Sequence, residues 1–250
     1  MDIGAYFERI GYHGGFEVSP ENLTQLIRKH LEAVPFENLD CWPEGKPLSN
    51  DPEVLYEKVV VRRRGGICFE LNGLLYELLS ALGYPCYSVA VRLPRPERPA
   101  AIVHQGVVVT LAGKQYYCDV GFGGPGPKGA LPLDEDPIQT VDGERFRVKR
   151  QGIYVNIQRY HEETWTDTIR YADIPFIRED FTGLLYFASS APGSHFVSQR
   201  IVNLCLPGGG SLALTGNRFT VRRNGEVIQK ELTTEDEIRA VLEKEYGIYM

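Results

Sequence analysis

RRRGGICFELN, residues 62–72, is the stretch on which the prediction of the fold rests. Within it and after it, apolar residues recur at intervals of three and four: Ile67, Leu71, Leu74, Leu75, Leu78 and Leu82. This spacing, followed by Gly83, predicts a helix that begins close to Cys68 and buries one face. The first turn of a helix carries unpaired N–H groups and a partial positive charge, which favour a thiolate over a thiol. Residues 62–72 therefore predict a nucleophilic cysteine, supported by the three arginines before it.

Two interpretations of Cys68 remain open at this point. Free cysteine is among the most buried residue types, so a cysteine on a helix is more often a core residue than a nucleophile. On the other side, Gly65 and Gly66 leave space for a substrate carbonyl, and their N–H groups could receive an oxyanion. The choice depends on whether a base lies near the thiol.

Composition limits the class of protein. The 250 residues, 43% hydrophobic and 24% charged, are typical of a globular chain with one large domain or a few packed subdomains. The net charge of −6 argues against a nucleic-acid partner. The early residues lack a long apolar run, so we expect neither a secretory signal nor a membrane anchor, and a cytoplasmic location. Five dispersed cysteines without CxxC spacing predict reduced thiols and no metal site.

The chain changes character after Pro85. Before it, caps and apolar stripes predict helices over residues 2–10, from Ser19 and Pro20 to 34, and from about 51 to 59. After it, period-two patterns predict strands over residues 86–93, 103–111, 115–122, 145–150, 154–160, 164–171, 200–206 and 211–215. Residues 180–188 fit either a short helix or the end of a strand. Asn224-Gly225 predicts a hairpin turn, and Thr234 with Glu237 predicts the capping box of a final helix.

A base for the thiol is predicted on one of these strands. A cysteine nucleophile needs a base, and the base needs an orienting group. His104 begins an apolar strand, and the next strand carries Asp119, a carboxylate that needs a partner in such surroundings. If a two- or four-residue loop joins the strands, paired residue numbers add to 225, Asp119 faces Gly106, and His104 lies diagonally on the same face. A three-residue loop would place the two side chains on opposite faces.

Three motifs now indicate a family. RGGICFELN at residues 64–72 resembles the RGGxCxExN nucleophile motif of the arylamine N-acetyltransferases, VPFENL at 34–39 resembles their PFENL segment, and DVGFG at 119–123 is similar to their DVGFG. The resemblance implies an α+β fold with a helical N-terminal domain, a central antiparallel β-barrel and a C-terminal α/β lid, around a cysteine-proteinase-like core. The expected divisions are residues 1–84, 85–188 and 189–250.

The resemblance also implies a chemistry. Cys68 would take an acetyl group from acetyl-CoA, with His104 as its base and Asp119 as the orienting carboxylate. An arylamine, hydrazine or arylhydroxylamine would then accept the group, in a ping-pong reaction without a metal. The glycine-rich segment is implied to lie beside the acetyl-CoA path, with Phe122 lining the acceptor pocket, and its candidate CoA contacts are Gly121, Gly123, Gly124 and Gly129. The same glycines could serve only a tight turn.

Other readings share part of this evidence. A papain-like hydrolase or a transglutaminase-like enzyme uses the same Cys-His-Asp set, with water or a lysine as acceptor. A non-catalytic binding module would need Cys68 only as a core residue. The chain also departs from the family pattern, because Leu185 stands where a polar Asn is usual, and Gln105 and Gly106 stand where larger apolar residues are usual.

Overall fold

The computed structural model describes residues 1–94 and 100–250. Its N-terminal part is helical, as predicted, with α1 (Ile3–Ile10), α2 (Pro20–Ala33), α3 (Pro52–Tyr56) and α4 (Cys68–Ala81). The hydroxyl of Ser19 accepts a hydrogen bond from the N–H of Asn22, with Pro20 at the first helical position, which confirms the predicted cap. The predicted third helix widens after Tyr56 into a π-helical turn, η1 (Glu57–Val61), before the arginine run.

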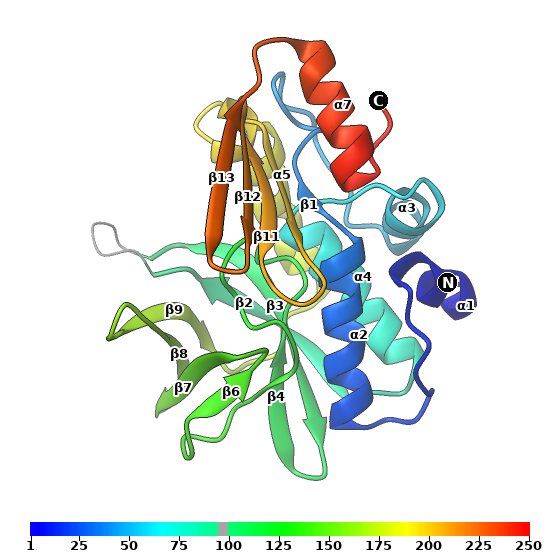
Figure 1. Ribbon diagram of the computed structural model, residues 1–250. Helices are drawn as coiled ribbons and strands as arrows, with labels where there is room; N and C mark the ends of the chain where they lie inside the picture. The colour runs from blue at the N-terminus through cyan, green and yellow to red at the C-terminus, as the bar shows by residue number, and fades with distance from the viewer. Residues whose placement is uncertain (95–99) are drawn as a thin grey trace.

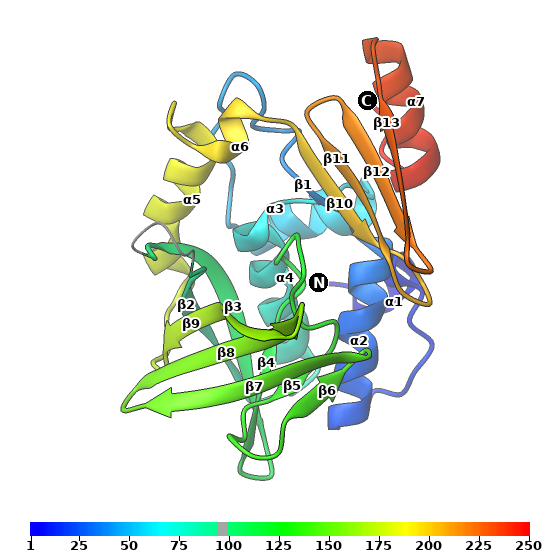
Figure 2. The same cartoon turned by 60° about the vertical axis from the view of Figure 1, so that its left-hand side comes forward.

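Helix α4 is the centre of the largest hydrophobic core. Its buried side chains include Leu71, Leu74, Leu75 and Leu78, the face that the sequence predicted. They pack with residues of α1 and α2 and with the inner side of two strands, β2 (Cys86–Arg92) and β3 (Ile102–Leu111). Figure 1 shows α4 behind α2, and Figure 2 shows it between α2 and these strands. The start of the helix is therefore held on several sides.

The second part is an antiparallel sheet of eight strands in the order β5-β4-β3-β2-β9-β8-β7-β6. The remaining strands are β4 (Lys114–Cys118), β5 (Leu131–Pro132), β6 (Gln139–Val141), β7 (Glu144–Gln151), β8 (Tyr154–His161) and β9 (Thr164–Ala172). The edge strands β5 and β6 contact each other, so the sheet curves into a nearly closed barrel. A separate apolar cluster, with Phe146 and Ile157 among its members, fills the interior.

The third part is a smaller antiparallel sheet in the order β1-β10-β11-β12-β13, covered by α7 (Glu235–Tyr246). Its strands are β1 (Phe36–Glu37), β10 (Ile201–Cys205), β11 (Ser211–Thr215), β12 (Arg218–Arg223) and β13 (Glu226–Glu231). The hairpin turn at Asn224 and Gly225 is confirmed by the pairing of Arg223 with Glu226. Figure 2 shows this sheet and α7 standing above the barrel. Its first strand comes from the N-terminal part of the chain, far from the other four.

The structure decides one element that the sequence left open and shortens one predicted strand. Residues 180–188 are helical, within η2 (Arg178–Phe181) and α5 (Thr182–Ser190), and a short α6 (His195–Ser198) follows. The boundary expected after residue 188 lies inside α5. The strand predicted to reach residue 122 stops at Cys118, because the N–H groups of Val120 and Gly121 bind side-chain oxygens instead of a neighbouring strand.

Among the described residues, we find no helix with the length and apolar character needed to cross a membrane.

Candidate active site

Cys68 is the first residue of α4, and its surroundings explain why the helix begins there. The carboxylate of Glu70 accepts a hydrogen bond of 2.9 Å from the N–H of Ile67, which caps the helix from within its first turn. The Cys68 side chain is buried at 3% exposure, and its Sγ lies 3.8 Å from the carbonyl oxygen of Val103 on β3. The thiol therefore lies between the start of α4 and the barrel.

A partly buried ion network supports the loop before the thiol. Lys58 lies 2.7 Å from Glu70 and 3.0 Å from Asp40, and Arg64 lies 2.9 Å from both Glu37 and Asp40. The network therefore joins the RGG segment to the residues around β1. The sequence predicted that the arginines would favour the thiolate, but Arg64 is balanced by carboxylates, and its position is structural.

The two glycines also differ from the prediction. The N–H of Gly65 donates to the carboxylate of Glu37 at 3.2 Å, and that of Gly66 donates to the carbonyl of Pro35 at 3.4 Å. Both N–H groups are occupied, so the predicted oxyanion role of these glycines is wrong. A Cβ atom at Gly65 would lie only 1.9 Å from the oxygen of Pro35, so glycine is needed for the close approach of these two segments.

The predicted register of β3 and β4 is confirmed. Every pair between the strands, from Val107 with Cys118 to Leu111 with Lys114, has numbers that add to 225. The two-residue loop works because Ala112 and Gly113 both have positive φ, 47° and 79°, as in the tight turns that fit the twist of a hairpin. His104 and Asp119 consequently lie on one face, with Nε2 of the imidazole 2.6 Å from Oδ2 of the carboxylate.

Asp119 is almost completely buried but well hydrogen-bonded. Its Oδ1 accepts from the amide of Asn72 at 2.8 Å and from the N–H of Gly121 at 2.9 Å. Its Oδ2 faces His104 and also accepts from the hydroxyl of Tyr117 at 2.8 Å. Burial raises the pKa of Asp119, but the charge of His104 and the hydrogen bonds outweigh burial and hold the pKa below its usual range. Asp119 is therefore a carboxylate at neutral pH.

His104 is held between this carboxylate and the thiol. Burial by itself lowers the pKa of His104, but the charges of Asp119 and Cys68, with their hydrogen bonds, raise it to about 10. Since Nε2 is bound to Asp119, the other ring nitrogen, Nδ1, is the one available to Cys68. The arrangement can therefore support a thiolate beside an imidazolium, which is a nucleophile paired with a proton donor.

Two further side chains of this cluster were not recognised from the sequence. Asn72 is four residues after Cys68 on the same face of α4, and Tyr117 is two residues before Asp119 on the same face of the β4 segment. Both are completely buried. The sequence did contain a signal for both residues. The helix and strand periodicities place Asn72 and Tyr117 on buried faces, where a polar side chain needs a hydrogen-bond partner.

A cavity of about 330 Å³ opens at the thiol. It is lined by Cys68, His104 and Gly121 and by a group of aromatic side chains, which are Phe36, Phe69, Phe122, Phe187 and Phe196. The Cβ of any residue at position 121 would lie 2.7 Å from the Cα of Cys68, so only glycine allows this segment to pass the nucleophile. Phe122 lines this cavity beside the thiol.

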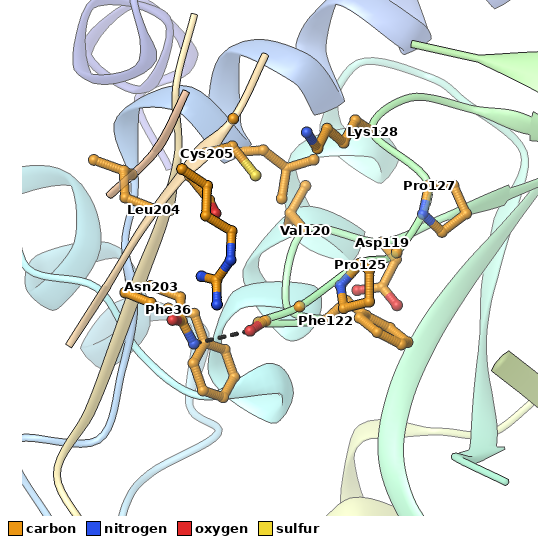
Figure 3. A pocket seen from close by; sticks show the side chains of 18 of the residues that line it. Phe36, Asp119, Val120, Phe122, Pro125, Pro127, Lys128, Asn203, Leu204 and Cys205 are labelled. Atoms are coloured by element: carbon orange, nitrogen blue, oxygen red, sulfur yellow. Dashed lines mark hydrogen bonds between the residues drawn. The ribbon is translucent and has the colours of Figure 1, made fainter. Parts of the chain in front are cut away.

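A larger cavity, of about 690 Å³, lies on the other side of Phe36 and Phe122, which line both cavities. Figure 3 shows its wall, which the glycine-rich segment forms with strand β10 of the smaller sheet. The amide of Asn203 donates to the carbonyl of Gly123 at 2.8 Å and fixes the segment. The basic side chains of Lys128, Arg159 and Arg222 line the same cavity.

The predicted CoA contacts divide between these places. Gly123 and Gly124 line the larger cavity, and Gly121 lines the smaller one. Gly129 is not among the residues that line these two cavities, and its Cβ would lie 2.8 Å from the side chain of Thr24 on α2. At this position, glycine allows the segment to pack closely against α2.

Comparison with known proteins gives a consistent result. The family model described as N-acetyltransferase matches residues 20–250. An arylamine N-acetyltransferase of Escherichia coli K12 is 32% identical over 251 residues, which cover 98% of this chain and 88% of that protein. One of Mycobacterium tuberculosis H37Rv is 30% identical over 99% of this chain and 89% of its own length.

Solved structures agree with these relatives. The arylamine N-acetyltransferase of Mycobacterium marinum superposes with a TM-score of 0.91 at 30% identity, covering 99% of this chain and 93% of that one. The same protein in complex with CoA gives a TM-score of 0.90 at 30% identity, with the same coverage.

Proposed function

Because this chain belongs to the arylamine N-acetyltransferase family, and is thus an acyltransferase, we propose that it carries an acetyl group on Cys68 from acetyl-CoA to an arylamine, hydrazine or arylhydroxylamine. The observation that carries the proposal is the position of His104 between Asp119 and Cys68. A thiolate made beside an imidazolium can attack a thioester at neutral pH.

The first half of the proposed reaction loads the enzyme. The Cys68 thiolate attacks the acetyl carbonyl, and the bond between the carbonyl carbon and the coenzyme A sulfur breaks. The imidazolium of His104 gives its proton to the departing sulfur, and Asp119 holds the ring in place. The N–H of Cys68 is at the first position of α4 and points out of the helix, like the other free N–H groups of a first turn. We assign it as a hydrogen-bond donor to the oxyanion.

The second half unloads it. The acceptor nitrogen attacks the acetyl group on Cys68, the carbon–sulfur bond breaks, and Cys68 returns to the thiolate. The neutral His104 takes the proton that the nitrogen loses, which restores the imidazolium. The two halves use the same groups in opposite protonation states, so the acetyl donor and acceptor bind in turn.

The two cavities suit the two substrates. In the larger cavity, Lys128 and Arg222 and the backbone of the glycine-rich segment can hold the phosphates of coenzyme A, and the thioester would pass between Phe36 and Phe122 to reach the thiol. The smaller cavity is lined by aromatic side chains on which a flat aromatic amine can pack. The M. marinum protein solved with CoA supports the choice of donor.

Intact-mass spectrometry tests the proposal directly. Mixing the protein with acetyl-CoA should add one acetyl group, which peptide mapping places on Cys68, and an arylamine should then remove it with formation of the acetylated amine. The adduct should be absent in Cys68→Ser and present in Cys86→Ser, whose thiol is half-buried. An adduct that water removes as fast as the amine does would indicate a hydrolase, and no adduct would reject the acetyl-cysteine.

A further inference from the structure

We propose that Tyr117 is a positioning residue of this site, which acts on His104 through Asp119 and can do so because residue 106 is glycine. The inference rests on the proposed function only in taking Asp119 as the group that orients His104. It concerns two residues on one face of the hairpin, Gly106 on β3 and Tyr117 on β4. They lie diagonally to each other, since Tyr117 pairs with Val108.

The contact between Tyr117 and Asp119 is direct. The tyrosine is completely buried, and its hydroxyl donates to Oδ2 of Asp119 at 2.8 Å. The same oxygen lies 2.6 Å from Nε2 of His104. The hydroxyl and the imidazole therefore share one acceptor atom, and the hydroxyl fixes the place of the oxygen against which the imidazole aligns.

The hydroxyl also completes the set of donors around the carboxylate. Asn72 and Gly121 donate to Oδ1, and His104 and Tyr117 face Oδ2, so each oxygen has two partners. A carboxylate offers about four acceptor positions, and in a buried site an unfilled one weakens the ionised form. Removing the hydroxyl would therefore leave Asp119 less strongly ionised and its Oδ2 less firmly placed.

Gly106 provides the space that the tyrosine occupies. A Cβ atom built at this position would lie 2.6 Å from both Oη and Cε2 of Tyr117 and 2.8 Å from Cζ. These distances are far below van der Waals contact, and the ring cannot retreat, since it stacks on Tyr171 with centroids 5.7 Å apart. Any side chain at residue 106 would thus push the hydroxyl away from Asp119.

Several titratable groups surround the carboxylate of Asp119 and can influence its ionisation. His104 and Tyr117 touch it, Cys68 lies beyond His104, Cys118 is its neighbour in the chain, and Tyr171 lies behind Tyr117. Burial, together with the charge of Asp119, raises the pKa of Tyr117 well above its ordinary value, so the hydroxyl keeps its proton and remains a donor.

Tyr117→Phe tests the proposal, because it removes the hydroxyl and keeps the ring. We expect kcat to fall about tenfold, the rate equivalent of ~1.4 kcal/mol for a hydrogen bond to a charged group, with little change in KM for acetyl-CoA. Because Asp119 would then be less strongly ionised, the acid limb of the pH profile should move to higher pH. This shift should appear both in kcat/KM and in the alkylation of Cys68 by iodoacetamide. The alkylation assay needs no acetyl transfer, so it reports on the thiol even if the proposed reaction is wrong.

Tyr171→Phe is the matched control. Its hydroxyl is buried in the same cluster and, within the residues that the structure describes, has no hydrogen-bond partner. The control should keep kcat and the pH profile of alkylation within about twofold of wild type.

Two variants that change Gly106 separate the effect of the position of the Tyr117 hydroxyl from the effect of side-chain volume. Gly106→Ala should reproduce the loss seen in Tyr117→Phe, including the shifted acid limb. Gly106→Ala combined with Tyr117→Leu restores the volume without the hydroxyl, so it should fold with a melting temperature near that of wild type and still show the low rate.

The outcomes are distinct. A wild-type Cys68 no more reactive than a free thiol would reject the nucleophile and this inference together. A reactive wild type with an unchanged Tyr117→Phe profile, or with equal losses in Tyr117→Phe and Tyr171→Phe, would overturn this inference alone. Recovery of the wild-type rate in the double variant would also overturn it, because volume would then be sufficient.

Discussion

The side-chain amide of Asn72 lies 2.8 Å from Oδ1 of Asp119 and joins the nucleophile helix to the barrel. The same amide nitrogen lies 2.6 Å from the carbonyl oxygen of Gln105. The side-chain oxygen of Asn72 accepts a hydrogen bond from the N–H of Val120 at 2.8 Å. One side chain on α4 thus fixes both β3, which carries His104, and the segment after β4, which carries Asp119. The distance from thiol to base depends on it.

Asn72→Ala should impair catalysis more than binding. The change removes one of the four hydrogen bonds of the buried carboxylate and the bonds of Asn72 to two backbone groups, at a cost of about 1–3 kcal/mol, so we expect kcat to fall roughly 5- to 150-fold. Steady-state kinetics with a fixed amine measures this effect. Asn50→Ala is the control, because its amide binds Arg178 and Thr182 instead, and an equal loss there would contradict the role assigned to Asn72.

His104 predicts a pH dependence of stability. Its ordinary pKa is 6.5 and its folded pKa is about 10, so the folded protein binds the proton more tightly. The resulting stabilisation is complete below about pH 6.5 and is lost as the pH rises through about 10. Denaturant unfolding of wild type and His104→Gln should differ most at low pH and converge towards pH ~10. The exposed His161→Gln serves as control, and a constant difference for His104→Gln would refute the assignment.

The buried pair behind the nucleophile should be sensitive to the loss of one partner. Lys58→Met leaves the buried Glu70 uncompensated, and we expect a loss of about 3–5 kcal/mol in unfolding free energy. Adding Glu70→Gln keeps the cap on Ile67 and removes the charge, so the double variant should recover part of the loss. Arg218→Ala breaks an exposed pair with Glu231 and should cost at most about 1 kcal/mol. Equal losses in all three variants would contradict this account.

The basic residues of the larger cavity should affect the donor alone. Lys128→Ala and Arg222→Ala should each raise KM for acetyl-CoA about two- to fivefold, as expected for partly exposed contacts to phosphate, and less at high salt. The rate with p-nitrophenyl acetate, which has no phosphate, should stay constant. Arg223→Ala is the control, since this exposed neighbour is not among the residues lining that cavity, and an effect as large as that of Arg222→Ala would argue against phosphate recognition.

Local signals accounted for much of this site before the structure was known. Helix α4 followed from its apolar spacing, and the register of β3 and β4 followed from a short loop and the need to pair His104 with Asp119. These features depend on neighbouring residues, so one sequence is enough to predict them.

Long-range contacts could not be predicted in the same way. The two residues of β1 have no strand pattern of their own, and they pair with residues 202 and 203 of β10 because the folded chain brings them together. The N–H groups of Gly65 and Gly66 are occupied by Glu37 and Pro35, which no spacing rule indicates. The contact of Tyr117 with Asp119 needed the space at Gly106, which is visible only in three dimensions.

The placement of β1 has a consequence for how the chain matures. Its N–H at Glu37 binds the carbonyl of Gly66 beside the thiol, while its other edge pairs with β10, and Asn38 binds the backbone at Phe196, Gln199 and Ile201. During synthesis from the N-terminus, the contacts that hold the loop before Cys68 can therefore form completely only after residues 196–203 have been made. We expect the site around the thiol to remain incomplete until most of the protein has left the ribosome, so Cys68 would become reactive only after the smaller sheet has formed.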